Sequence, residues 1–246
     1  MKDCRLFGVS VALGTREELY RRILSLFESG GTVATVNATM LEYARTHKDF
    51  RDTLCSMSLC IPDGKGVSRA FLKMGEYTDV LPGVELGLLL LCSRPYLRLA
   101  LYGGKRAVGE RAAQAILSLC PTVDIVYVRD GYRHTPFEVA RDLSLQEVDL
   151  VYVCLGSPRQ EEVARMLSQV LPKAVVIGLG GSFDVWCGDI TRAPEKIRDA
   201  GLEWLYRMLK EPRRLAKLPA LFSFEMHSFL ERLRTKSTKN YRKSEM

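Results

Sequence analysis

Short apolar segments alternate with amphipathic segments along most of the chain. Nearly every position is apolar in five runs rich in β-branched residues, which begin at Thr32, Leu97, Val123, Asp149 and Lys173. Each run is followed by a turn. Strands buried on both faces of a parallel sheet show this continuous apolar pattern, because helices cover the sheet on both sides. The pattern therefore predicts an α/β fold with a mostly parallel sheet.

Helix starts follow several of these strand ends. Thr15 and Glu18 have the spacing of a capping box, Asn37 precedes the helical pattern ATMLEYARTH, and Pro158 opens a further helical pattern. In open α/β sheets, ligands bind outside the carboxyl ends of the strands. The turns between strands and helices are therefore where we expect a functional site.

The composition is that of an ordinary compact protein. Hydrophobic residues make up 47% and charged residues 26% of the 246 residues. The most apolar run, Leu86 to Cys92, is much shorter than the roughly 20 residues of a membrane-spanning helix, and the N-terminus carries no long apolar signal core. These features predict a cytoplasmic location.

The seven cysteines form no CxxC pair and the chain has three histidines, which argues against zinc and against a disulfide framework.

The net charge of +7 comes entirely from the last part of the chain. Eleven Lys or Arg and four Glu lie between Leu205 and Met246, whereas the 25 basic and 25 acidic residues before Leu205 cancel. This shift predicts a core over residues 1–204 and a basic appendage over residues 205–246, which meets a negatively charged partner.

Three of the strand-end turns are rich in glycine. They read LYGGKRAVGER, VCLGSPRQE and GLGGSFDV, and they contain Gly103, Gly104, Gly156 and Gly181. Glycine lets the backbone approach a phosphate, and the following helix presents N–H groups to an anion. A tight strand-to-helix connection explains each glycine equally well. The chain has neither a G-x-G-x-x-G fingerprint opening a helix nor a GxxxxGK[ST] loop, which argues against dinucleotide binding and against a P-loop.

Asp63 is the candidate general base. The segment IPDGKGV places this carboxylate at a strand end, beside two glycines and ahead of a helical pattern. Asp-Gly is also a common turn pair and Asp a preferred N-cap, so a purely structural role competes with catalysis. Thr35 and Asn37 lie at the end of the preceding strand, where short polar side chains can bind a sugar or a base. Asn37 is equally well placed to be a plain N-cap.

The order of these segments resembles the order found in one family of enzymes. The series TVNATMLEYA, IPDGKGV, LYGG, RDGY, LGSPRQE and GLGGSFDVWCGDITRAPEKIRDAGLEWLYRMLKEPRR is similar to that of the WecG/TagA/CpsF glycosyltransferases. The resemblance runs from about Gly8 to Arg214. Its most specific stretches are the PRQE turn and the RAP, EWLYR and EPRR series, which packing alone does not dictate together.

The resemblance implies an inverting glycosyltransferase with a Rossmann-like core. Such an enzyme transfers a sugar, often an N-acetylhexosamine such as N-acetylmannosamine, from a UDP donor to a polyprenyl-diphosphate-linked sugar in cell-surface polysaccharide or teichoic acid synthesis. It implies Asp63 as the base and Thr35, Asn37 and Gln160 around the pocket, with no metal or other cofactor. The motifs that carry the resemblance add further substrate-binding candidates: Gly103, Gly104, Gly131, Tyr132, Gly156, Glu161, Gly181 and Asp184.

The basic appendage has two predicted roles. Arg207, Arg213 and Arg214 follow directly from the core, and guanidinium groups match diphosphate oxygens in place of a metal, although a solvated face also explains them. Beyond Pro219, an apolar stripe at helical spacing precedes a basic end, which predicts a helix lying on the anionic cytoplasmic face of a membrane. Packing on the core or on another subunit of a homo-oligomer is the alternative. The stripe consists of Phe222, Met226, Phe229 and Leu233.

The chain departs from the family pattern at a few positions. Val80 and Leu81 stand where the family has Arg-Val, Glu85 stands in place of Asp, and Arg133 in place of an apolar residue. These changes leave the donor sugar and the acceptor open.

Two other functions compete with glycosyl transfer. The missing glycine fingerprint argues against a soluble enzyme that modifies nucleotide sugars. A nucleic-acid-binding protein is disfavoured because the tail has few aromatic residues and the core carries no excess charge.

Overall fold

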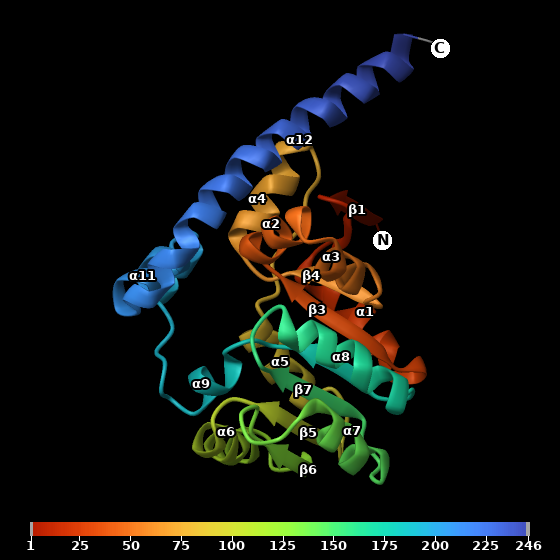
Figure 1. Cartoon of the computed structure of the whole chain (residues 1–246), viewed down its shortest axis with the longest axis vertical. Helices are drawn as coiled ribbons and strands as arrows, with labels where there is room; N and C mark the ends of the chain where they lie inside the picture. Colours follow the sequence, from red (N-terminus) through yellow and green to blue (C-terminus); the bar gives the residue numbers. More distant parts are fainter. Residues whose placement is uncertain (1, 245–246) are drawn as a thin grey trace.

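Six parallel strands form the central sheet, in the order β4-β3-β8-β7-β5-β6. The computed structural model describes residues 2–244, and of residues 212–214 and 234–244 it describes the backbone alone. The predicted α/β, Rossmann-like fold with a parallel sheet is confirmed (Figure 1). The strands are β3 (Gly31–Val36), β4 (Leu59–Pro62), β5 (Arg98–Gly103), β6 (Asp124–Arg129), β7 (Leu150–Cys154) and β8 (Val175–Gly178).

Helices cover both faces of this sheet. Successive strand residues point to opposite faces, so Leu99 and Leu101 join one apolar cluster, whereas Ala100 and Tyr102 join another. One face is packed by α1 (Arg16–Ser29), α5 (Gly83–Leu91), α6 (Arg106–Leu119) and α9 (Ser182–Trp186). The other is packed by α2 (Ala38–Thr46), α3 (Lys48–Cys55), α4 (Lys65–Lys73), α7 (Pro136–Ser144) and α8 (Arg159–Val170).

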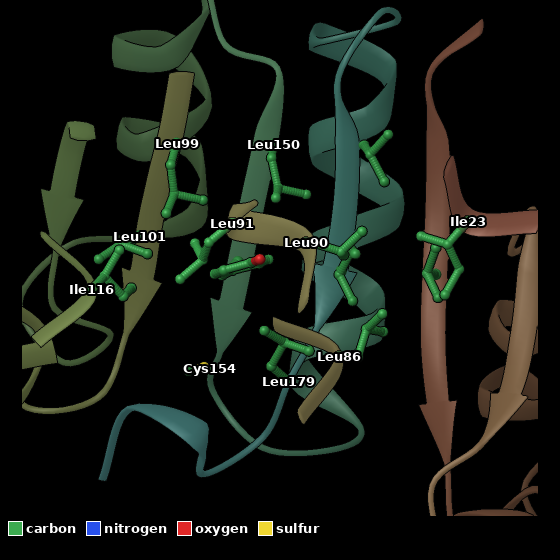
Figure 2. Packing of buried hydrophobic residues seen from close by; sticks show 14 of the residues in the cluster. Ile23, Leu86, Leu90, Leu91, Leu99, Leu101, Ile116, Leu150, Cys154 and Leu179 are labelled. Atoms are coloured by element: carbon green, nitrogen blue, oxygen red, sulfur yellow. The ribbon is translucent and has the colours of Figure 1, made fainter. Parts of the chain in front are cut away.

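The apolar run beginning at Leu86 forms helix α5, which packs on the sheet. Its side chains Leu86, Leu90 and Leu91 are fully buried and meet strand residues such as Leu150 (Figure 2). Tyr152 donates a 2.6 Å hydrogen bond from its hydroxyl group to the Gly87 carbonyl. The Trp186 indole N–H donates a second hydrogen bond, of 3.2 Å, to the Val84 carbonyl, so contacts also fix the amino-terminal end of α5 that carries Gly83 and Glu85.

The helix starts that the sequence indicates are confirmed. The Thr15 side chain accepts a hydrogen bond from the Glu18 backbone N–H, and the Glu18 side chain accepts one from the Thr15 N–H. The Asn37 side chain accepts from the Met40 N–H and caps α2. Pro158 occupies the N-cap position of α8.

An antiparallel hairpin at the N-terminus was not predicted. It consists of β1 (Lys2–Leu6) and β2 (Val9–Leu13), joined by Phe7 and Gly8. Both joining residues have positive φ, 53° and 85°. Two-residue turns of this kind usually carry Asn-Gly or Asp-Gly, because those residues adopt positive φ at low cost. The unusual phenylalanine at the first turn position hides the hairpin from sequence reasoning.

The C-terminal part of the chain forms a short series of helices that ends in a long one. These elements are α10 (Glu195–Asp199), α11 (Glu203–Lys210), the 3-10 helix η1 (Pro212–Lys217) and α12 (Leu218–Ser244), so the predicted boundary between residues 204 and 205 falls inside α11. Figure 1 shows α12 running past α2 and α4 and away from the core. Within the described residues, no helix is long and apolar enough to span a bilayer.

The two sides of α12 are different. Leu221 and Phe224 pack on the core, where the rings of Phe7 and Phe224 meet edge to face with centroids 5.8 Å apart. Lys73 of α4 and Glu225 form an ion pair of 2.7 Å. The predicted stripe of Phe222, Met226, Phe229 and Leu233 lies exposed. The first turns of α12 are therefore part of the folded core, while its apolar stripe remains accessible.

Candidate active site at the carboxyl ends of the strands

A cleft of about 1590 Å³ lies at the carboxyl ends of the central strands. The chain leaves β3 for α2 on one face of the sheet and leaves β8 for α9 on the other, so the strand order reverses between these neighbours. Ligands of open α/β sheets bind at such a point. Helices α11 and α12 contribute the outer wall. The predicted site residues in its lining are Thr35, Asn37, Asp63, Gly156, Gln160, Gly181 and Arg207.

Asp63 follows the last residue of β4 and faces the cleft. Its backbone N–H donates to the Val36 carbonyl at 2.9 Å, and its Oδ1 accepts from the Gly83 N–H at the start of α5 at 2.8 Å. Burial raises the pKa of Asp63 to about 6. The hydrogen bond from the Gly83 N–H and the charge of Arg207 lower this pKa, whereas the charge of Glu203 raises it. A carboxylate that titrates near neutral pH is suited to accept a proton from a hydroxyl group.

The raised pKa of Asp63 predicts a pH-dependent gain in stability for Asp63→Asn. The folded-state pKa of about 6 lies above the ordinary value of 3.8, so the folded state binds the proton more tightly than the unfolded state. Ionised Asp63 consequently destabilises the fold above that range. We expect a higher Tm for Asp63→Asn than for the wild type at pH 8, with the gain disappearing below about pH 4. Calorimetry at the two pH values measures it, and an equal gain at both would contradict the raised pKa.

Thr35 and Gln160 are fixed by hydrogen bonds to the strand and turn of β8. The Thr35 hydroxyl donates to the Gly178 carbonyl at 2.9 Å. Gln160 accepts from the Gly180 N–H at 2.8 Å and donates from Nε2 to Glu161 at 2.7 Å. Their side chains therefore enter the cleft in defined orientations. Asn37 combines the two roles that the sequence left open, because it caps α2 and also lines the cleft.

Glu161 lies behind the cleft wall rather than in it. The side chain is almost completely buried, and burial raises its pKa to about 7. Its Oε1 accepts the hydrogen bond from Gln160. Glu161 thus holds the amide of a residue that lines the cleft.

The turns after β5 and β6 pack against each other beside the cleft. A side chain at Gly103 would place its Cβ 2.3 Å from the Cys154 carbonyl oxygen, so this position requires glycine. The Gly104 N–H donates to Cys154 and the Gly131 N–H donates to Gly104. Close packing thus accounts for the glycines here, and ligand contact stays a prediction. The predicted site residues that do not line the cleft are Gly103, Gly104, Gly131, Tyr132, Glu161 and Asp184.

Sequence reasoning missed a group of ion pairs in the cleft wall. Glu85 of α5 accepts from Arg192 at 2.9 Å and from Arg16 of α1 at 2.7 Å, and it lies 3.5 Å from Arg198 of α10. Arg192 also pairs with Glu203 of α11 at 3.4 Å. The signals were present, because Arg192 begins the RAP stretch and Glu203 begins EWLYR. Residues this far apart in the chain could not be paired without the fold.

The appendage brings Arg207 into the cleft. Arg207 lies one helical turn after Glu203 on α11, and its positive charge lowers the pKa of Asp63. The side chains of Arg213 and Arg214 lie outside the described residues, so their predicted role stays a prediction.

Of the four unusual positions, Leu81 is buried and Glu85 takes part in ion pairs through its side chain, whereas the hydrogen bonds at Val80 and Arg133 are made by the main chain and do not depend on which residue stands there. The Val80 carbonyl accepts from Arg16 at 3.4 Å, and Leu81 is fully buried. Glu85 keeps a carboxylate in the cleft, where it joins the ion pairs. The Arg133 N–H donates to Asp130 in the turn after β6. In the described part of the chain, no three His, Cys, Asp or Glu side chains are grouped as metal ligands.

The fold and the cleft together define a Rossmann-like α/β enzyme with a carboxylate and cationic side chains at its candidate active site. A family model described as "Glycosyl transferase WecG/TagA/CpsF family" matches residues 4–238. The chain belongs to this family and is a glycosyltransferase.

Three curated relatives share the name N-acetylglucosaminyldiphosphoundecaprenol N-acetyl-beta-D-mannosaminyltransferase. The relative from Bacillus subtilis (strain 168) is 34% identical over 192 residues, which cover 77% of this chain and 75% of the relative. The relative from Bacillus spizizenii is 31% identical over 196 residues, covering 77% and 76%. That from Staphylococcus aureus (strain MRSA252) is 27% identical over 224 residues and 88% of each chain.

Proposed function

We propose that this chain transfers N-acetylmannosamine from a UDP donor to N-acetylglucosaminyl-diphospho-undecaprenol, as a step in cell-surface polysaccharide or teichoic acid synthesis. The family and the names of the curated relatives support the sugar and the acceptor. The observation that carries the proposal is the position of Asp63, at the carboxyl end of β4 and in the wall of the large cleft.

Asp63 acts as the general base in the proposed reaction. The carboxylate accepts the proton of the acceptor hydroxyl, whose oxygen then attacks the anomeric carbon of the donor. The bond between that carbon and the phosphate oxygen breaks, and UDP leaves with the bonding electrons. Attack opposite the leaving group inverts the anomeric configuration. A base of this kind contributes about 10²–10⁴-fold to the rate.

Arg207 is suited to stabilise the departing diphosphate. The residue lines the cleft and its charge acts on Asp63, so a ligand between α11 and the strand ends lies near both. A guanidinium group pairs with phosphate oxygens in two parallel hydrogen bonds. Arg213 and Arg214 join Arg207 in this role in the proposal.

Helix α12 is proposed to hold the enzyme on the cytoplasmic face of the membrane that carries the acceptor. Leu221 and Phe222 line the cleft, and Phe222 also begins the exposed apolar stripe. The cleft wall therefore continues into the surface that would enter the lipid. Basic residues concentrated toward the C-terminus favour an anionic surface.

A donor screen tests the proposed function. The purified chain is incubated with UDP-N-acetylmannosamine, UDP-N-acetylglucosamine or UDP-glucose, each with and without a short-chain N-acetylglucosaminyl-diphospho-lipid, and UDP release is followed. Release should depend on the acceptor and be fastest with UDP-N-acetylmannosamine. Faster release from another donor would contradict the proposed sugar. Release that does not depend on the acceptor would contradict the proposed acceptor.

Activity is expected to survive chelation of divalent metals. Arginine side chains and helix N-termini supply the positive potential that a metal supplies in other transferases. UDP release in the presence of excess EDTA should remain close to the untreated rate, with a metal-dependent transferase as the control. Loss of release with EDTA, restored by Mg²⁺ or Mn²⁺, would contradict the metal-independent mechanism.

A further inference from the structure

The cleft wall contains a chain of ion pairs that joins the core to the C-terminal helices. Its three members are Glu85, Arg192 and Glu203, which are called here the ion-pair chain. Arg192 is the central member, with Nη1 2.9 Å from Glu85 and Nε 3.4 Å from Glu203. The side chain of Arg192 is 18% exposed, so the pairs are shielded from much of the solvent. Shielded pairs resist screening by salt more than surface pairs do.

Both ends of the ion-pair chain lie close to groups that act on Asp63. Glu85 lies in the first turn of α5, two residues after Gly83, whose N–H donates to Asp63. At the other end, Glu203 and Arg207 are four residues apart on α11, a spacing that places both side chains on one face of a helix. Holding Glu203 in place therefore also holds the face of α11 that carries Arg207.

We infer that Glu85, Arg192 and Glu203 are positioning residues, which hold α11 against the core so that Glu203 and Arg207 lie beside the candidate base. The inference rests on the proposed function for the role of Asp63. The pairing of Glu85 with Arg16 anchors the core end, because it binds the start of α5 to α1, and the contact of Glu85 with Arg198 adds a second link from the core to α10.

The charges of the ion-pair chain also determine when Asp63 ionises. Glu203 raises the pKa of Asp63, whereas Arg207 and Arg192 lower it. The groups facing Asp63 or the ion-pair chain from the elements around them are Gly83 N–H and Glu85 on α5, Arg16 on α1, Arg192 before α10, Arg198 on α10, and Glu203 and Arg207 on α11. Neutralising Glu203 and neutralising Arg192 should thus have opposite effects on the same titration.

The pH dependence of kcat/KM separates this role from a purely structural one. Glu203→Gln removes the charge that raises the pKa of Asp63, so the acidic limb should move to lower pH. Arg192→Gln removes a charge that lowers it and takes away the Arg192 partner of Glu203, so the limb should move to higher pH. Shifts of about half a pH unit are expected for charges across a partly hydrated cleft. Glu17→Gln and Arg21→Gln neutralise an exposed pair on α1 and should leave the profile unchanged. Shifts in the same direction, or none, would overturn the inferred electrostatic role.

Amide hydrogen exchange tests the positioning without any transferase activity. Residues 203–210 should exchange about tenfold faster in Arg192→Gln and in Glu85→Gln than in the wild type, because α11 loses its attachment. Arg21→Gln serves as the control. Unchanged exchange in both variants would overturn the inference even if the enzyme is active. If exchange is faster in the variants but the wild-type protein transfers no sugar, the positioning role of the ion-pair chain is supported and only the proposed function is rejected.

Discussion

Replacing Asp63 by asparagine is expected to reduce the rate of sugar transfer by about 10²–10⁴-fold, the usual contribution of a general base. Asparagine is nearly the same size and can still accept the hydrogen bond from the Gly83 N–H through its side-chain oxygen. It cannot accept a proton at neutral pH. Single-turnover rates with saturating donor and acceptor measure the loss, while donor binding should change little.

The pH profile gives a second measure of the same role. Asp63 has to be ionised to act, and its pKa is raised to about 6, so kcat/KM of the wild type should fall as the pH drops through about 6. Asp124→Asn, at an exposed position on β6, is the matched control and should keep the wild-type rate and profile. An Asp63→Asn enzyme that keeps more than roughly a third of the wild-type turnover would remove Asp63 from the mechanism, because a general base contributes far more than that.

Replacing Phe222, Met226 and Phe229 together by serine is expected to weaken binding to anionic vesicles by about 100-fold or more. These side chains are 71%, 56% and 48% exposed, so the core does not depend on them. Complete burial of one such side chain is worth about 1.5–3 kcal/mol, and about 1.4 kcal/mol corresponds to a tenfold change in binding. Co-sedimentation with vesicles containing phosphatidylglycerol measures the change.

The loss of vesicle binding has a matched control in the same chain. Tyr96, Phe137 and Leu145 are 79%, 78% and 83% exposed, and they lie outside the C-terminal helices. Changing these three to serine should leave vesicle binding intact. Transfer to a short, water-soluble acceptor should be affected little by the control replacement or by replacing Met226 and Phe229 alone, because neither of these two residues lines the cleft. If the α12 variant sediments with vesicles as the wild type does, the stripe is not the membrane contact, and a subunit interface becomes the better explanation.

Local patterns were enough to predict a mostly parallel sheet, although β4 was indicated only by the strand end placed before Asp63 and the strand order was not predicted. The five apolar runs form parallel strands, and the capping residues Thr15 and Asn37 begin helices as expected. The hairpin at Phe7 and Gly8 was missed because its turn uses a residue that rarely adopts positive φ. For α12, the apolar spacing predicted the exposed stripe, but the docking of Phe224 on the core depends on partners distant in the sequence.

The candidate site could be predicted only in part. Asn37 and Asp63 directly follow strands, Thr35 is the second-last residue of β3, and Gln160 lies in the first turn of the helix after β7. Parallel topology brings such residues to one edge of the sheet. Glu161 was expected to touch substrate, but the structure places it behind Gln160, because sequence spacing does not show which side of a turn is buried. The Glu85, Arg192 and Glu203 pairs depend on the return of the C-terminal segment to the core, and no local pattern encodes that return.

The mass of the lipid product is the most direct test of glycosyl transfer with Asp63 as base. The purified enzyme is incubated with N-acetylglucosaminyl-diphospho-lipid and UDP-N-acetylmannosamine, and the lipid is analysed by mass spectrometry. The acceptor should gain the mass of one N-acetylhexosamine residue with the wild type and with Asp124→Asn, and almost none with Asp63→Asn in the same time. An unchanged acceptor mass with every UDP-sugar tested, or an equal gain with Asp63→Asn, would contradict the account.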